Sequence, residues 1–105
     1  MSIFPKILSR DKDKFTTFHM NITNGSDEDI EGYISYKITK PNGEIDIKEF
    51  DRLEKIQAHS EINLYDKYYI DKNFQVGRYW VDGRFFWEND NILSDTNKND
   101  YFDIE

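Results

Sequence analysis

One stretch, Gly77 to Trp87, constrains the fold more than any other part of the chain. It reads Gly-Arg-Tyr-Trp-Val-Asp-Gly-Arg-Phe-Phe-Trp and contains both tryptophans of the sequence. Tyrosine, tryptophan, valine and phenylalanine favour the pleated, half-buried surface of a β-sheet. The stretch is therefore predicted to be one long central strand of an antiparallel sheet.

The side chains of this stretch fall into two rows, because successive residues of a strand point to opposite faces. The row that is almost entirely apolar is expected to face the core: Tyr79, Val81, Gly83, Phe85 and Trp87. The row that mixes charges with aromatic rings is expected to meet solvent or a partner: Arg78, Trp80, Asp82, Arg84 and Phe86. Asp82-Gly83 is also typical of a tight hairpin turn, so a break at that dipeptide is the alternative.

The rest of the chain reads as further strands separated by turn residues, such as Asn24-Gly25-Ser26 and Pro41-Asn42-Gly43. The predicted strands are 15–23, 31–39, 44–50, 60–65 and 101–104. Residues 3–8 contain Pro5 and are predicted to be an edge strand or a lead-in to the next strand. Residues 66–74 are expected to form a connection, and the polar residues 88–100 a long loop. Without convincing helical periodicity, the sequence predicts one all-β domain over residues 1–105, a sandwich of about seven antiparallel strands.

Composition limits the chemistry that the chain can perform. A chain of 105 residues with 16% aromatic residues can bury a core without cross-links. Because the sequence has no cysteine, disulfides and thiolate metal sites are excluded. The formal net charge of −7 argues against a nucleic-acid partner and against an anionic membrane surface, since nucleic-acid binders concentrate Lys and Arg on one face.

Sequence signals for targeting are lacking. No apolar run is long enough to span a bilayer, and the start of the chain shows no basic region followed by an apolar run, as a signal peptide would. A cytoplasmic location is therefore expected, with a module of a larger secreted protein as the alternative.

The order of turns and strands resembles a known pattern. Its motifs are Asn-x-Thr-Asn-Gly-Ser at 21–26, Pro-Asn-Gly at 41–43, Ser60 with Ile62 and Leu64, Gly-x-Tyr-x-Val at 77–81, and Phe-x-Ile at 102–104. Over residues 15–105 the chain resembles bacterial Ig-like modules of the fibronectin type III and CARDB kind. It is also similar to Ig-like carbohydrate-binding domains and to the BsuPI family of intracellular proteinase inhibitors. The resemblance implies an immunoglobulin-like β-sandwich, in which the hydroxyl of Tyr79 ties down a neighbouring connection.

Four residues of the polar row are the candidate ligand-binding site: Trp80, Phe86, Arg78 and Arg84. Exposed aromatic rings beside groups that donate hydrogen bonds suit a sugar ring or a protein hot spot. Arginine over tryptophan also gains a cation–π contact. The alternative is that another strand, the N-terminal segment or the long loop covers these rings.

Acidic and amide side chains suggest a cation site in two places. Asp95, Asn97 and Asn99 place oxygen ligands at alternate positions, as a calcium loop begins, but Asp100 occupies the position where such a loop needs glycine. They are a candidate calcium site in another loop geometry, with a solvated loop as the alternative. The acidic cluster at 27–31 could bind a cation or a basic partner, but a solvated turn is the expected reading.

The sequence favours binding over catalysis. His19 and His59 lie far apart, neither has the spacing of a zinc site, and no pair of carboxylates stands out for acid–base chemistry. No cofactor and no enzymatic activity are expected. The predicted function is a non-enzymatic module that binds a protein or a carbohydrate. The alternatives are a structural subunit, with edge strands that allow a homo-oligomer, and a small acidic inhibitor or immunity-like protein.

Overall fold

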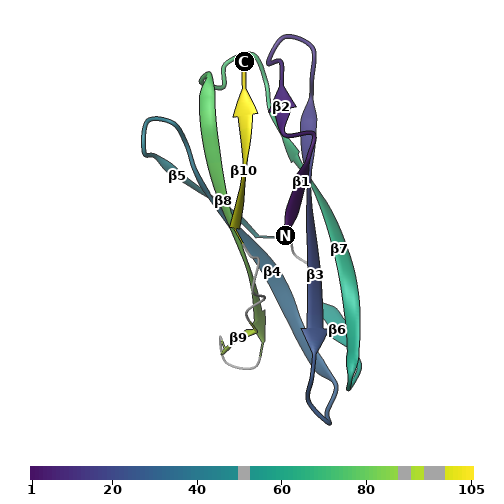
Figure 1. The fold of residues 1–105 in the computed structure, drawn as a ribbon. Helices are drawn as coiled ribbons and strands as arrows, with labels where there is room; N and C mark the ends of the chain where they lie inside the picture. Colours follow the sequence, from purple (N-terminus) through teal and green to yellow (C-terminus); the bar gives the residue numbers. More distant parts are fainter. Residues whose placement is uncertain (50–52, 88–90, 94–98) are drawn as a thin grey trace.

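The computed structural model describes residues 1–49, 53–87, 91–93 and 99–105, which form strands and turns without a helix (Figure 1). The strands are β1 (Ser2–Phe4), β2 (Ile7–Leu8), β3 (Phe15–Asn24), β4 (Ile30–Thr39), β5 (Ile45–Glu49), β6 (Glu54–Ile56), β7 (Ser60–Tyr69), β8 (Gly77–Trp87), β9 (Asn91–Leu93) and β10 (Asn99–Ile104). Nothing in the described residues forms a helix long and apolar enough to cross a membrane. The prediction of an all-β domain is confirmed.

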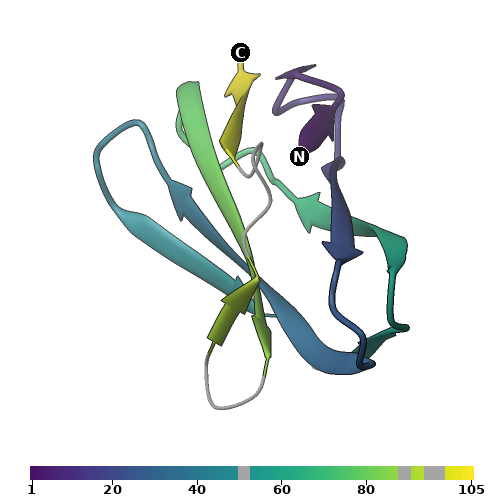
Figure 2. The same cartoon turned by 60° about the horizontal axis from the view of Figure 1, so that its bottom comes forward.

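The strands are divided between two sheets that face each other, as Figure 2 shows. The smaller sheet has the order β1-β3-β7, and the larger has the order β2-β10-β8-β4-β5. β6 extends the larger sheet beside β4, and β9 lies beside β8. All the pairs are antiparallel except that of β2 with β10, which is parallel. β8 therefore lies inside the larger sheet, as the sequence predicts.

The alternation predicted for residues 77–87 is confirmed. Tyr79, Val81 and Phe85 are buried in the core, whereas Trp80 is 53% exposed. β8 pairs continuously with β4, from Trp87 opposite Gly32 to Trp80 opposite Thr39. A hairpin turn at Asp82-Gly83 is thereby excluded.

Aromatic rings hold the two sheets together. Phe18 of β3 lies 4.9 Å from Tyr36 of β4, 5.4 Å from Tyr68 of β7 and 6.2 Å from Phe102 of β10, measured between ring centroids. Phe102 in turn stacks on Tyr79 of β8 at 5.0 Å. Because aromatic pairs add to the burial of apolar area, this cluster joins strands from both sheets into one core.

The number and length of the strands differ from the prediction of about seven. Residues 3–8 form two short strands on either side of a cis Phe4–Pro5 bond, and β6 and β9 are further short strands. β7 continues to Tyr69, where the sequence predicts a connection from residue 66. The sequence did not predict this extension because a charged residue, Asp66, occupies an inward position of the strand, where an apolar residue is expected. Asp66 is 3% exposed and accepts a hydrogen bond from the Tyr36 hydroxyl at 3.3 Å.

The Tyr79 hydroxyl ties down the connection between β7 and β8. It donates a hydrogen bond to the Gln75 carbonyl oxygen at 2.8 Å, four residues upstream. Burial raises the pKa of Tyr79, which favours the protonated phenol that donates this bond. This contact agrees with the role that the family resemblance implies for Tyr79.

We expect Gly32→Ala to destabilise the fold because β4 and β8 approach closely at this residue. A Cβ atom at Gly32 would lie 2.1 Å from the Phe86 carbonyl oxygen and 2.7 Å from the Phe85 ring. Forcing atoms into a packed site costs about 1–3 kcal/mol of unfolding free energy, and a backbone oxygen cannot move aside as a flexible side chain can. Urea denaturation measures the loss. Gly25→Ala is the control, since nothing lies within 4 Å of its Cβ position. Equal urea midpoints for the two variants would contradict the close approach of β4 and β8 at Gly32.

We expect Tyr68→Phe to cost about 1–2 kcal/mol of unfolding free energy. The Tyr68 hydroxyl donates a hydrogen bond to Asp46 Oδ2 at 2.9 Å, which links β7 to β5 across the core. Burial of the ring, together with this carboxylate, raises the pKa of Tyr68. The same denaturation measurement on Tyr65→Phe, a change to an exposed ring of the same strand, should show no loss.

Candidate functional site

The four predicted site residues share the outer face of β8 but form two separate groups. Arg78 and Trp80 lie near the Gly77 end of the strand, and Arg84 and Phe86 near the Trp87 end. At about 3.3 Å per residue, the six residues from Trp80 to Phe86 span roughly 20 Å. The two groups are therefore separate surfaces.

The group around Trp80 gains two residues from outside β8. Tyr101 of β10 is the register partner of Trp80, and the two rings lie 5.4 Å apart at an interplanar angle of 57°. Two cations approach the Tyr101 ring: Arg78 Cζ lies 4.0 Å and Lys6 Nζ 4.2 Å from its centroid. We call Lys6, Arg78, Trp80 and Tyr101 the Trp80 patch.

Carboxylates fix both cations of the Trp80 patch in place. Arg78 donates from Nε to Asp103 Oδ1 at 2.8 Å and from Nη2 to Oδ2 at 3.1 Å. This bidentate contact lowers the pKa of Asp103 and raises the pKa of Arg78. Lys6 Nζ forms an ion pair with Asp100 and donates to the Tyr101 carbonyl oxygen at 3.3 Å. The patch thus has positioned hydrogen-bond donors but little net charge.

The group at the other end of β8 presents less free aromatic surface. Phe86 is half-buried and stacks on Tyr33 of β4, with ring centroids 5.5 Å apart. Arg84 donates to Asp82 Oδ2 from Nη2 at 3.1 Å and from Nε at 3.3 Å. Trp80, at 53% exposure, is therefore the main accessible ring among the four predicted residues.

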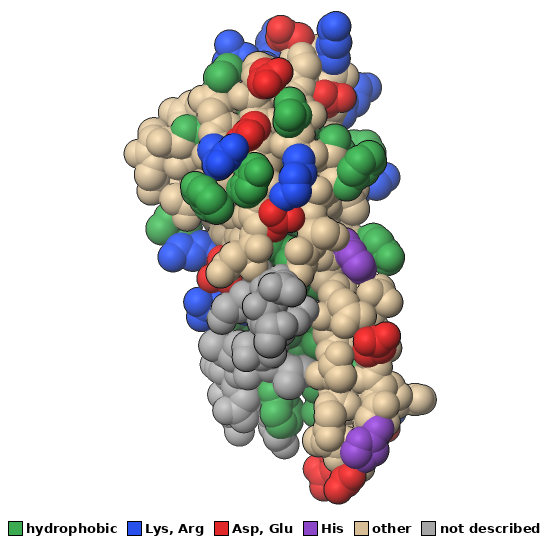
Figure 3. Space-filling view, in the orientation of Figure 1, with side chains coloured by type: hydrophobic (Ala, Val, Ile, Leu, Met, Phe, Trp, Pro, Cys, Tyr) green, Lys and Arg blue, Asp and Glu red, His purple; other side chains and the backbone are tan. Residues whose placement is uncertain are grey.

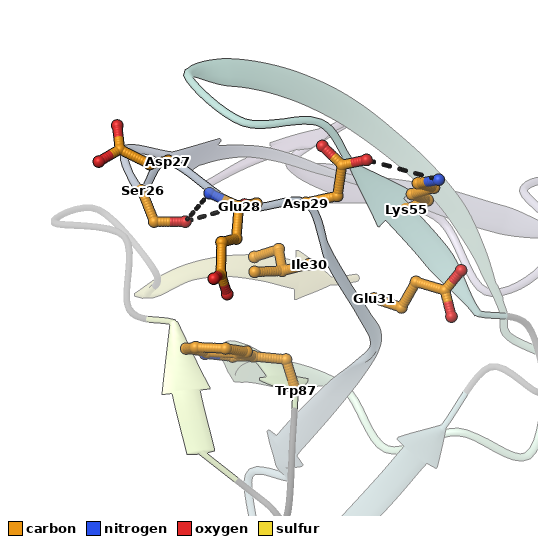
Figure 4. A pocket seen from close by; sticks show the side chains of 8 residues that line it. All are labelled: Ser26, Asp27, Glu28, Asp29, Ile30, Glu31, Lys55 and Trp87. Carbon is orange, nitrogen blue, oxygen red and sulfur yellow. Dashed lines mark hydrogen bonds and ion pairs between the residues drawn. The ribbon is translucent and has the colours of Figure 1, made fainter.

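An open hollow of about 720 Å³ lies beyond this end of β8, beside the turn between β3 and β4 (Figure 4). Figure 4 shows Glu28 and Ile30 pointing toward the indole of Trp87, with Asp27 pointing away. Asp29 accepts a hydrogen bond from the Ala58 amide at 2.9 Å and lies 3.5 Å from Lys55 Nζ, and these contacts lower its pKa. The predicted acidic cluster thus lines a polar hollow, and the charge of one member, Asp29, is partly compensated by Lys55 and the Ala58 amide.

Charge is distributed unevenly along the molecule. Around the turn between β3 and β4, Lys55 is outnumbered by the carboxylates of Asp27, Glu28, Asp29, Glu31, Glu54 and Glu61. In the remaining described residues, Lys and Arg equal Asp and Glu in number. Figure 3 shows hydrophobic, basic and acidic side chains interspersed in the upper half of the molecule, and acidic side chains without basic ones at its lower tip. We call this tip the acidic end.

The predicted calcium site remains a prediction. Asp95 and Asn97 lie outside the described residues, and Asn99 begins β10 as the register partner of Asp82. Among the described residues no group of three or more His, Asp or Glu side chains is arranged to hold a metal ion.

Sequence reasoning missed Tyr101 and Lys6. The alternation of residues 101–104, with Phe102 and Ile104 facing inward, already placed Tyr101 on an outer face. The sequence does not give the order of the strands in the sheet, however. The contact between Tyr101 and Trp80 could therefore not be predicted from it. Lys6 reaches the same ring only because β2 pairs with β10.

Comparison with known proteins finds a similarity of fold to solved structures. No protein-family model and no curated protein matches the chain. Among solved structures, the chain is similar to the Pseudomonas fluorescens alkylpurine DNA glycosylase AlkC bound to DNA containing an abasic site analog. The TM-score is 0.71 at 14% sequence identity, and the match covers 98% of this chain and 28% of the glycosylase chain. At this identity the likeness shows a shared fold, and the chain spans less than a third of the longer protein.

This finding corrects two predictions made from the sequence. The solved structure that shares this fold is bound to DNA, which contradicts the prediction of a module that binds a protein or a carbohydrate. It likewise overturns the exclusion of a nucleic-acid partner. The exclusion used the net charge of the whole chain, much of which is carried by the acidic end, and so it took no account of local surfaces with little net charge.

Proposed function

We propose that this chain is a DNA-binding domain that contacts DNA through the Trp80 patch. The observation that carries the proposal is an exposed indole, Trp80, set beside the guanidinium of Arg78. The ammonium of Lys6 lies over the adjacent ring of Tyr101. Aromatic rings that stack with bases, next to donors for phosphate oxygens, are the usual elements of such surfaces. The fold shared with part of a DNA-bound glycosylase gives independent support.

The domain that carries this patch is, in our proposal, an immunoglobulin-like sandwich. β1, β3 and β7 correspond to strands A, B and E of that fold, and β10, β8, β4 and β5 to G, F, C and C′. Tyr79 supports the same assignment. It lies near the start of the F-strand equivalent and bonds back to the connection before it, as a corner tyrosine does.

The acidic end does not oppose DNA binding at the Trp80 patch. Trp87 borders the acidic hollow and lies seven residues along β8 from Trp80, a separation of roughly 23 Å. The Debye length at physiological ionic strength is about 8 Å, so the repulsion from the acidic end is largely screened at the patch. The acidic end instead restricts where along the molecule a phosphate backbone can lie.

The glycosylase activity of the longer protein is not part of this proposal. The chain matches less than a third of that protein, and the shared fold can carry unrelated functions. What we propose is binding, by the residues of the Trp80 patch.

We expect the chain to bind fluorescein-labelled DNA, with dissociation constants no weaker than about 100 µM at low salt, the weak end of non-specific binding. Fluorescence anisotropy with single-stranded and duplex oligonucleotides measures this. Trp80→Ala should weaken binding because it removes the stacking ring. The double variant Arg78→Gln with Asp103→Asn keeps the net charge unchanged, so any loss of affinity reports the guanidinium contact rather than the global charge.

Tyr65→Ala is the matched control. Tyr65 is 64% exposed on β7 and stacks on its register partner His19 of β3. Both lie in the smaller sheet, so removing Tyr65 deletes an exposed ring outside the patch. Its affinity for DNA should equal that of the unchanged protein. If the chain binds neither single-stranded nor duplex DNA, the proposed function is refuted. If Trp80→Ala and Tyr65→Ala lose the same affinity for DNA, the placement of the binding site at the Trp80 patch is refuted.

A further inference from the structure

We infer that the Trp80 patch binds an unpaired base, so that its preferred ligand is single-stranded or locally unpaired DNA rather than a perfect duplex. The inference rests on the proposed function, because it names the form of DNA that the same surface accepts. Three features of the patch lead to it: the exposure of the indole, the short side chain beside it on β4 and the scarcity of uncompensated positive charge.

The indole of Trp80 is the stacking surface of the patch. The other ring, that of Tyr101, has two cations within 4.2 Å of its centroid, which leave little of it for another partner. Tyr101 therefore serves to hold Lys6 and Arg78 in place. Trp80 keeps 53% of its surface exposed, and Arg78 approaches it only to 5.8 Å.

The surroundings of Trp80 favour a single nucleotide over a duplex. Its register partner on the other side is Thr39 of β4, a short side chain, followed in the same row by Ile45 of β5, which is 54% exposed. The ring thus stands on a sheet face with the short Thr39 side chain between it and the exposed Ile45. In a duplex the faces of the bases are buried in the stack, so an aromatic ring on such a surface can stack only with a base that is unpaired.

The cations of the patch can make only a few contacts with phosphate groups. Asp103 engages Nε and Nη2 of Arg78, and within the described residues Nη1 makes no hydrogen bond, so it can donate to one phosphate oxygen. Lys6 is paired with Asp100. Because each cation is accompanied by a carboxylate, the patch suits one or two phosphates rather than the two closely spaced strands of a duplex. Stacking must then supply much of the affinity.

The test compares three labelled DNA probes under one condition: a thymidine oligonucleotide of roughly ten nucleotides, a perfect duplex, and the same duplex with a bulged thymidine. We expect the single strand and the bulged duplex to bind at least about fivefold more tightly than the perfect duplex. Trp80→Ala should reduce single-strand affinity by at least about fivefold, the lower end for loss of one stacked base, with Trp80→Phe retaining part of it. Circular dichroism of each variant checks that the fold is intact.

Two further readouts separate stacking from charge. Single-strand binding should quench tryptophan fluorescence, and the quench should be lost in Trp80→Phe, where Trp87 is the remaining tryptophan. Between about 50 and 200 mM salt, the logarithm of the single-strand affinity should fall with a slope no steeper than about −1.5, since each phosphate contributes about −0.7.

The outcomes distinguish this inference from the function on which it depends. If the perfect duplex binds as tightly as the single strand, the preference for an unpaired base is wrong while DNA binding stands. A steep salt slope together with unchanged affinity of Trp80→Ala also overturns it, because phosphate contacts would then dominate. If no probe binds, the proposed function fails and the inference fails with it.

Discussion

The position of β8 between β4 and β10 determines both the core and the surface of this protein. On its inner side, Tyr79, Val81 and Phe85 enter a core in which Phe18 and Phe102 join the two sheets. On its outer side, the same pairing places Trp80 beside Tyr101. Because side chains alternate strictly along a strand, one register fixes which rings stabilise the fold and which remain free for a ligand.

Electrostatics in this molecule are local. The carboxylates gathered around the turn between β3 and β4 account for much of the net negative charge, while cations and carboxylates balance over the other described residues. At the Trp80 patch, Asp103 and Asp100 hold Arg78 and Lys6 over an aromatic ring. These pairs position the donors and remove most of their long-range field, so the contact with bases that we propose here does not require a basic protein.

Much of the fold follows from patterns within single strands. The phase of Gly77–Trp87, the inward rows of β3 and β4 and the turn at Pro41-Asn42-Gly43 all agree with the sequence. The errors occur where a local pattern is interrupted. Asp66 faces the core with Tyr36 as its partner, so a polar residue in an apolar row concealed the second half of β7.

The sequence by itself determined the all-β class, the central strand and the outward placement of Arg78 and Trp80, because these depend on alternation over a few residues. Only the tertiary structure decided that Tyr101 and Lys6 complete the patch and that Phe86 lies half-buried against Tyr33. It alone separated the acidic end from the rest of the surface. The physical reason is that strand order and the packing of chain ends depend on contacts between residues far apart in sequence, and alternation within a strand carries no information about its neighbours.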